Sequence, residues 1–341
     1  MSIITVTGVI ESDRLGIITP HEHILLDIRN QFVEFHEASR KNLSEQKVGI
    51  ENLDVLSRDP WALKDNLVLE DLKVAIEELN RFKAASGETV VDVTTLGMGR
   101  NPLSLRNISK LTGLNIIMGC GYYTCDTHPE DMDNKSVDDI AEEILNDINI
   151  GVDSTEIRSG IIGEIGTSEE IHPNEKKVLI ASAKAHIETG VPIMVHTFPW
   201  GKRGIEALDI LEDNNARLDK VCICHVDVVD DIKYCKEIIK RGAYIEFDDF
   251  GKEFYVDGVE KLFMRDIDRI NNIIGLIQSG YISNILISCD VCLKNLLHKY
   301  GGWGYDHILN NIIPIMKKKG IDKKHIDLLL IGNPTKFLDI K

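Results

Sequence analysis

Six side chains of the types that bind transition metals each lie at or just after the end of a short apolar run in this sequence of 341 residues. They are His21, His23, Glu164, His196, His225 and Asp290. A single histidine at the end of a strand is more often a packed or surface group than a ligand. Six such placements rarely coincide by chance, so the joint pattern predicts a metal site.

The ligand types indicate which ions this site would bind. Four imidazoles with two carboxylates suit zinc, manganese, cobalt, nickel or iron(II), and suit calcium or magnesium poorly. Six ligands exceed the three that one catalytic zinc ion usually takes from a protein. Two divalent transition-metal ions, most simply zinc, would use all six if one carboxylate bridged them. Such a pair acidifies a water molecule and polarises the oxygen of the bond under attack, which is hydrolytic chemistry.

The cysteines offer a rival zinc site, formed by Cys222 and Cys224 with the pair Cys289 and Cys292. Strand alternation argues against it: if His225 points into a barrel, Cys222 and Cys224 point outward to the helices. The same reasoning opposes Cys289 to the aspartate that follows it. We interpret these residues as buried core thiols. A nucleophilic triad is not indicated either, because the sequence has no GxSxG motif and no cysteine with a protease signature.

Eight short runs rich in β-branched and apolar residues have the length of buried parallel strands. They span Gly16–His23, Thr89–Thr94, Asn115–Gly119, Gly160–Ile165, Pro192–His196, Val221–His225, Ala243–Phe247 and Asn284–Cys289. Stretches with helical spacing lie between them, and the clearest are Leu69–Ala85, Val137–Ile150, Pro173–Thr189, Ile205–Asn214, Asp231–Arg241, Val259–Ser279 and Asp306–Lys319.

This alternation predicts βαβ units, a parallel sheet and an α/β fold, specifically a (β/α)8 TIM barrel that forms a single domain over residues 1–341. An open doubly wound sheet is less favoured, because neither GxGxxG after the first strand nor GxxxxGK[ST] occurs. The six ligand-type residues would then meet at the carboxyl ends of the strands, where barrel active sites form. The polar segment Asp27–Asp65 is expected to form a long loop over the barrel mouth.

Composition limits the partners of the chain. Its net charge of −16, from 39 Lys and Arg against 55 Asp and Glu, disfavours nucleic acid and anionic membrane surfaces, so we expect a small-molecule substrate. The first 16 residues lack a signal-peptide pattern, and no apolar run approaches the roughly 20 residues that span a bilayer. Seven cysteines without a secretion signal favour reduced thiols. We therefore expect a cytoplasmic protein.

With these residues in place, the chain resembles the phosphotriesterase family of the amidohydrolase superfamily. The matching stretches are ThrProHisGluHis at 19–23, GlyGluIleGlyThrSer at 163–168, ValHisThr at 195–197, CysHisValAsp at 224–227, SerCysAsp at 288–290, GlyGlyTrpGlyTyrAsp at 301–306 and GlyAsnPro at 332–334. They occur in the family's order and spacing and cover nearly the whole chain. The HxH pair alone is a weak signal, whereas the full set is very specific.

The resemblance implies a role for each ligand-type residue. His21, His23 and Asp290 would bind the more buried metal, and His196 and His225 the more exposed one. Glu164 would bridge the two, where phosphotriesterases and related lactonases have a carbamylated lysine. This places the chain with the phosphotriesterase-homology and phosphotriesterase-related branches. Glu169 and Glu170 are nearby alternatives, although they follow the strand end and are expected to be solvated.

Further implications concern catalysis and assembly. Asp290 would accept a proton from the bridging hydroxide as it attacks, and Tyr123 would face the substrate oxygen unless it only packs beside Tyr122. Asp249 stands where phosphotriesterases have a histidine and many lactonases an arginine. A carboxylate there should disfavour nearby anionic groups and efficient organophosphate hydrolysis. A homodimer is also implied.

These observations predict a metal-dependent hydrolase of a carboxyl ester, lactone or amide. Phosphoester or phosphotriester hydrolysis by the same metal centre is the alternative. A barrel that binds a small ligand or metal without turnover is the third reading, which an intact ligand set disfavours.

Overall fold

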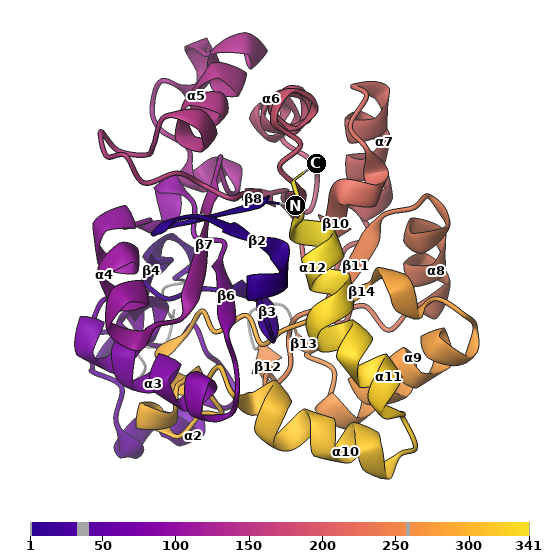
Figure 1. The fold of residues 1–341 in the computed structure, drawn as a ribbon. Helices are drawn as coiled ribbons and strands as arrows, with labels where there is room; N and C mark the ends of the chain where they lie inside the picture. Colours follow the sequence, from indigo (N-terminus) through magenta and orange to yellow (C-terminus); the bar gives the residue numbers. More distant parts are fainter. Residues whose placement is uncertain (1, 33–40, 257–259, 341) are drawn as a thin grey trace.

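Eight parallel strands form the centre of the protein in a computed structural model that describes residues 2–32, 41–256 and 260–340 (Figure 1). In sheet order they are β3 (Ile18–Glu22), β6 (Thr89–Asp92), β7 (Asn115–Cys120), β8 (Ile161–Gly166), β9 (Ile193–His196), β10 (Val221–Ile223), β11 (Tyr244–Phe247) and β14 (Ile285–Ile287). The Glu22 carboxylate joins the two ends of the sheet, accepting hydrogen bonds from the backbone N–H groups of Cys289 (3.1 Å) and Val291 (2.8 Å). The predicted (β/α)8 barrel is confirmed.

Helices follow the strands and surround the barrel (Figure 1). They are α3 (Leu72–Ala84), α4 (Pro102–Thr112), α5 (Val137–Asn149), α6 (Pro173–Thr189), α7 (Gly204–Asp213), α8 (Ile232–Lys240), α9 (Asp266–Gln278), α10 (Ile313–Lys318), α11 (Lys323–Asp327) and α12 (Asn333–Leu338). Each predicted helical stretch overlaps one of them. No helix among the described residues is long and apolar enough to cross a membrane.

Three of these helices, α4, α11 and α12, lie in no predicted helical stretch, and a fourth, α9, starts later than predicted. Helix α4 was not predicted, although its sequence carries helix signals: Asn101 caps its first turn through a bond from the Ser104 N–H (3.1 Å), and Gly113 ends it with φ 71°. Helix α9 starts seven residues later than predicted, because the pair of short strands β12 (Tyr255–Val256) and β13 (Lys261–Leu262) precedes it. Val259, the predicted start, lies outside the described residues.

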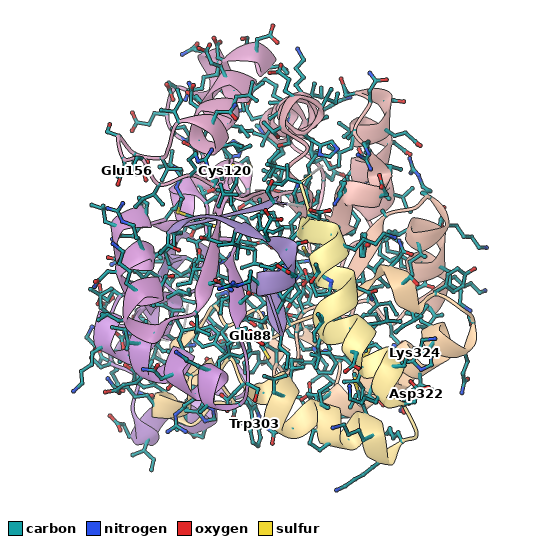
Figure 2. The ribbon with its side chains drawn as sticks, in the orientation of Figure 1. Glu88, Cys120, Glu156, Trp303, Asp322 and Lys324 are labelled. Carbon is teal, nitrogen blue, oxygen red and sulfur yellow. The ribbon has the colours of Figure 1, made fainter. Side chains whose placement is uncertain are left out.

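Apolar side chains fill the barrel interior and the layer between strands and helices, while Glu156, Asp322 and Lys324 lie at the periphery (Figure 2). The strand hairpin of β1 (Ser2–Thr5) and β2 (Gly8–Glu11) contributes Ile3 to the interior, and α12 contributes Phe337. A bridge between Ser2 and Ile340 holds the two ends of the chain together. The amino-terminal hairpin and the last helix therefore complete the barrel core.

The side-chain directions of the two cysteines at β10 differ from the prediction. Cys222 and Cys224 point into the barrel, where they pack with interior residues of the other strands, and not outward to the helices. Strand alternation does not extend to His225, because β10 ends at Ile223 and His225 has a φ of +58°. Both thiols are buried and free of disulfide bonds, as core thiols should be.

The segment Asp27–Asp65 begins and ends beside the barrel mouth. Its described part contains the short helix α2 (Leu53–Leu56), and a small core of Val48, Leu56, Ala62 and Leu63 packs within it. Strand β4 (Leu26–Asp27) pairs with β5 (Val68–Leu69) and brings the two ends of the segment together. Residues 33–40 of the predicted loop lie outside the described residues.

Candidate active site

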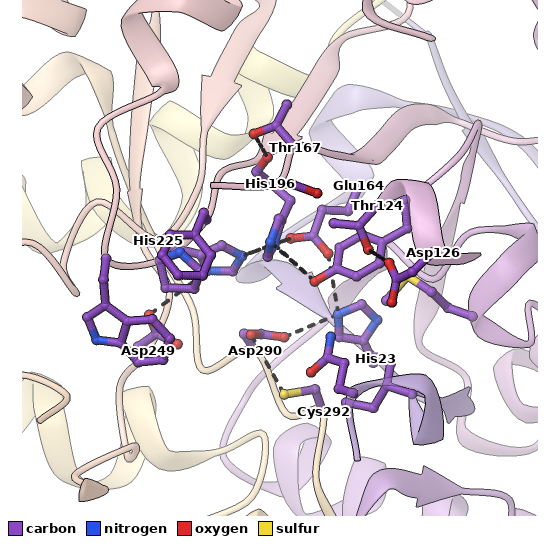
Figure 3. A pocket seen from close by; sticks show the side chains of 18 of the residues that line it. His23, Thr124, Asp126, Glu164, Thr167, His196, His225, Asp249, Asp290 and Cys292 are labelled. Carbon is purple, nitrogen blue, oxygen red and sulfur yellow. Dashed lines mark hydrogen bonds and ion pairs between the residues drawn. The ribbon is translucent and has the colours of Figure 1, made fainter. Parts of the chain in front are cut away.

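A cavity of about 460 Å³ opens at the carboxyl ends of the barrel strands. Five of the six predicted ligand residues line it, and the sixth, His21, lies fully buried beneath them. Figure 3 shows His23, Glu164, His196, His225 and Asp290 converging from different strand ends. The barrel thus brings together residues that are up to 269 positions apart in the sequence, from His21 to Asp290.

The Glu164 carboxylate is the centre of this cluster. Its Oε1 lies 2.9 Å from His225 Nε2, 3.0 Å from His196 Nδ1 and 3.6 Å from His21 Nε2. Its Oε2 lies 3.9 Å from His23 Nε2, and that nitrogen is 3.2 Å from Asp290 Oδ1. All these side chains are buried, so the polar atoms face one another in a confined space.

Two sets of three ligand atoms share Glu164. One set comprises His21, His23 and Glu164, and the other comprises Glu164, His196 and His225. Within each set the atoms lie within 4.8 Å of one another, so each could surround a single ion. His21 Nε2 is buried and has no hydrogen-bond partner among the described residues, and it lies 3.7 Å from Asp290 Oδ1. An unpaired buried ring nitrogen that faces carboxylate oxygens fits a bound cation.

Charge in the cluster favours the ionised form of Glu164. Burial alone would raise the pKa of this carboxyl group, but His21 and His196 beside it outweigh that effect and hold the pKa well below its usual range. A carboxylate that stays ionised at neutral pH is in the form that binds metals.

A layer of carboxylates beneath the cluster orients the imidazoles. His225 Nδ1 lies 3.0 Å from Asp248 Oδ1, and His21 Nδ1 lies 3.4 Å from Asp248 Oδ2 and 3.3 Å from Glu246 Oε2. His23 Nδ1 is 2.9 Å from Thr94 Oγ1. These partners occupy Nδ1 of the His21, His23 and His225 rings and leave Nε2 to face the cluster, whereas His196 turns its Nδ1 to Glu164.

These orienting residues were not predicted. Glu246 and Asp248 alternate along the end of β11, so their shared face was a signal in the sequence. The contact of this face with His21 could not be predicted, because it depends on the order in which the strands close the barrel.

Asp249 is paired with a lysine that the sequence analysis did not single out. Lys252 Nζ lies 2.8 Å from Asp249 Oδ1 and donates a short hydrogen bond to Asp290 Oδ2. The expectation that Asp249 repels anionic groups assumes that its carboxylate is unpaired. The structure instead places the buried ammonium group of Lys252 beside it, which offsets its negative charge. Lys252 shares a loop with Asp249 and lies three residues further along the chain, so helix-like spacing was the available signal.

Tyr123 and the nearby glutamates complete the set of predicted site residues. The Tyr123 hydroxyl is 3.2 Å from His196 Nδ1 and lines the cavity. Burial raises the pKa of this phenol well above its usual value, so it remains a hydrogen-bond donor. Tyr122 turns away and donates to Glu143. Glu169 and Glu170 are exposed and belong to none of the ligand groups among the described residues.

The outer part of the cavity is largely aromatic. Trp200 packs edge-on against Phe198, with ring centroids 5.6 Å apart, and against Phe263 at 5.5 Å. Trp61 lines the same cavity and donates its indole N–H to Gln31 at 3.0 Å. A substrate entering this cavity passes apolar walls before it reaches the polar cluster.

Comparison with known proteins defines the class of the chain as a hydrolase built on this barrel. A model of the phosphotriesterase family matches residues 1–338, so the chain belongs to the phosphotriesterase family. N-acetyltaurine hydrolase of Dictyostelium discoideum is 38% identical, with 98% of this chain and 97% of that protein covered.

Two solved structures extend the comparison. A resiniferatoxin-binding protein from Rhodobacter sphaeroides has a TM-score of 0.97 and 37% identity over 99% of this chain and 95% of its own. The lactonase Lmo2620 from Listeria monocytogenes has a TM-score of 0.81 and 26% identity, and both chains are covered completely. The predicted family and hydrolase class are confirmed.

Proposed function

We propose that this chain is a binuclear metal-dependent amidohydrolase that cleaves a small N-acyl amide. The observation that carries the proposal is the sharing of Glu164 by two sets of buried ligands. Such a site can hydrolyse esters, lactones and amides, and whole-length similarity to N-acetyltaurine hydrolases supports the choice of an amide.

The donor set fits a pair of transition-metal ions. His21, His23 and Asp290 would hold one, His196 and His225 the other, and Glu164 would bridge them. Zinc is the simplest choice, and manganese, cobalt, nickel or iron(II) are compatible with the same ligands. When bound, the two ions would supply Lewis acidity and an acidified water.

The side chains of the cavity have distinct roles in the reaction. Tyr123 donates its hydroxyl hydrogen toward the substrate carbonyl oxygen and orients it. The water oxygen bonds to the carbonyl carbon while Asp290 Oδ1 takes up one water proton. Asp290 then returns this proton to the amide nitrogen as the C–N bond breaks, so an acid and an amine are released. The aromatic walls limit the access of bulk water to these steps.

Lactone hydrolysis is the second candidate, because the Listeria relative is named a lactonase and the same residues would serve an oxygen leaving group. A substrate panel separates the candidates: N-acetyltaurine, N-acyl amino acids, lactones and aryl phosphates, each tested with protein loaded with zinc or manganese. We expect the highest kcat/KM for an N-acyl amide. A higher value for a lactone or an aryl phosphate would contradict the amide assignment. If metal-loaded protein hydrolyses none of these compounds, the chain would instead be a barrel that binds a ligand without turnover.

A further inference from the structure

Lys252 is held in a fixed position at the wall of the cavity. The chain around it is anchored by Arg269 of α9, which donates to the Lys252 carbonyl oxygen (3.2 Å) and to Asp227 Oδ2 (2.7 Å). The neighbouring Gly251 N–H donates to Asp266 Oδ1 at 2.9 Å. Lys252 itself is 4% exposed, so its ammonium group is part of a built site and not a solvated surface charge.

The surroundings of this ammonium group are otherwise acidic. Lys252 is the only lysine or arginine among the described residues that line the cavity. The carboxylates that line it are Asp126, Glu164, Glu169, Asp249 and Asp290. Of the side chains there, Lys252 therefore offers the permanent positive charge to which an anionic group of a substrate could bind.

Lys252 has hydrogen-bonding capacity left for such a group. An ammonium group has three N–H donors. Asp249 and Asp290 take two of them, and the described residues provide no third partner. Asp290 also belongs to the proposed metal ligands, so part of its charge is directed away from Lys252.

The location of Lys252 determines which end of the substrate it would meet. In the proposed reaction, on which this inference rests, Asp290 returns a proton to the amide nitrogen. Lys252 contacts Asp290 directly, so in this reaction it would lie beside the leaving amine and not beside the acyl group. An acidic group one or two carbons from the amide nitrogen would lie within reach of the ammonium.

We propose that Lys252 is a specificity-determining residue that binds the anionic group of the leaving amine, so that the substrates are N-acyl derivatives of amino acids or aminosulfonates. A neutral amide lacks the partner for the third N–H and would be bound more weakly. Asp249 holds the ammonium in place by its ion pair.

Three substrates of similar shape test this inference: N-acetyltaurine with a sulfonate, N-acetyl-β-alanine with a carboxylate, and N-propylacetamide without charge. Replacing Lys252 with Met should lower kcat/KM for the two acids about 100-fold more than for the neutral amide, mainly through KM. The larger loss between the two acids identifies the preferred acid. An equal loss on all three substrates would mean that Lys252 only positions Asp290, and would overturn the proposal.

Lys294→Met is the matched control. Lys294 is also a buried lysine, paired with Asp65 at 2.8 Å, and it does not line the cavity. This variant should leave the preference for acids over the neutral amide unchanged. If Lys252→Met does not fold, Lys252→Arg keeps the charge but displaces it. It should raise KM for the acids more than for the neutral amide, and equal changes would again overturn the proposal.

A binding measurement separates this inference from the proposed function. If wild-type protein hydrolyses none of the three compounds, the amidohydrolase assignment fails. Calorimetric titration with N-acetyltaurine and N-propylacetamide then decides on Lys252. Tighter binding of the acid that is lost in Lys252→Met would support the anionic site. Binding without that preference, or no binding of the acid, would overturn it.

Discussion

Glu164 and Asp290 occupy different positions in the cluster and have different predicted roles. Glu164 lies between the two ligand sets, whereas Asp290 lies at the side, where its second oxygen meets Lys252. Both are buried, and the charges around each hold its pKa below the usual range against the effect of burial. The other oxygen of Asp290, Oδ1, faces the cluster 3.2 Å from His23 Nε2, a position from which a carboxylate can accept and return a proton.

Asp290→Asn should retain the shape of this side chain but lose its ability to accept a proton. We expect kcat to fall by roughly 100-fold to 10,000-fold, measured on the best amide of the panel. Asp126→Asn removes an exposed carboxylate from the same cavity and should change kcat little. Turnover near the wild-type value in Asp290→Asn would exclude the proton-transfer role.

Asp248 contacts two of the proposed metal ligands and does not line the cavity. It accepts a hydrogen bond from His225 Nδ1 and lies close to His21 Nδ1. Asp248→Asn removes the negative charge from both contacts, so the two imidazole rings should be held less firmly in place. We expect metal affinity to fall by about 10-fold to 100-fold, measured by competition with a chromophoric chelator. The exposed Asp126→Asn should bind metal as wild type does. Unchanged affinity in Asp248→Asn would show that the rings are held by packing alone.

Among the elements, β11 and the loop after it contribute most to the site beyond the predicted residues. The strand supplies Glu246, and the loop supplies Asp248, Asp249 and Lys252. Arg269 joins this loop to the loop after β10 through its bond to Asp227. One buried guanidinium group therefore fixes the position of two walls of the cavity.

Arg269→Met should destabilise the protein, because it leaves the Asp227 carboxylate buried without its cation. We expect the free energy of unfolding to fall by roughly 3–5 kcal/mol, measured by urea denaturation. Arg265→Met is the control on the same helix end. Arg265 pairs with Asp268 at the surface, so its loss should cost less than about 1 kcal/mol. Equal losses in the two variants would contradict the anchoring role.

The elements also show where prediction from sequence ends. Eight strands and seven helical stretches follow from local patterns of apolar residues, and their alternation predicts the barrel. The side-chain direction of Cys224 was predicted wrongly, because His225 adopts a left-handed backbone conformation that ends the strand alternation. No pattern of residues in the sequence indicates this conformation. The roles of Glu246 and Lys252 depend on contacts across the closed barrel, so they emerge only from the three-dimensional structure.

At the scale of the whole molecule, the core and the site are separable. Far more residues take part in the apolar packing inside the barrel and between strands and helices than in the ligand cluster. The proposed metal ligands lie above this core, at one end of the barrel. The fold should therefore persist without metal, while the site becomes a group of facing imidazoles and carboxylates.

Removal of metal by a chelator should abolish hydrolysis and lower Tm, while the far-UV circular dichroism spectrum stays that of the folded protein. Metal that binds the folded chain stabilises it by mass action, so Tm should rise again on addition of zinc or manganese. A chelated protein that loses its secondary structure at room temperature would contradict the separation of core and site.

Metal content per chain tests the central claim most directly. Protein purified without added metal or chelator would be measured by elemental analysis, beside a Glu164→Gln variant prepared in the same way. We predict about two equivalents of transition metal in the wild type and fewer in the variant, which lacks the bridging charge. A wild-type chain that contains no metal and takes up none on incubation would contradict the binuclear centre.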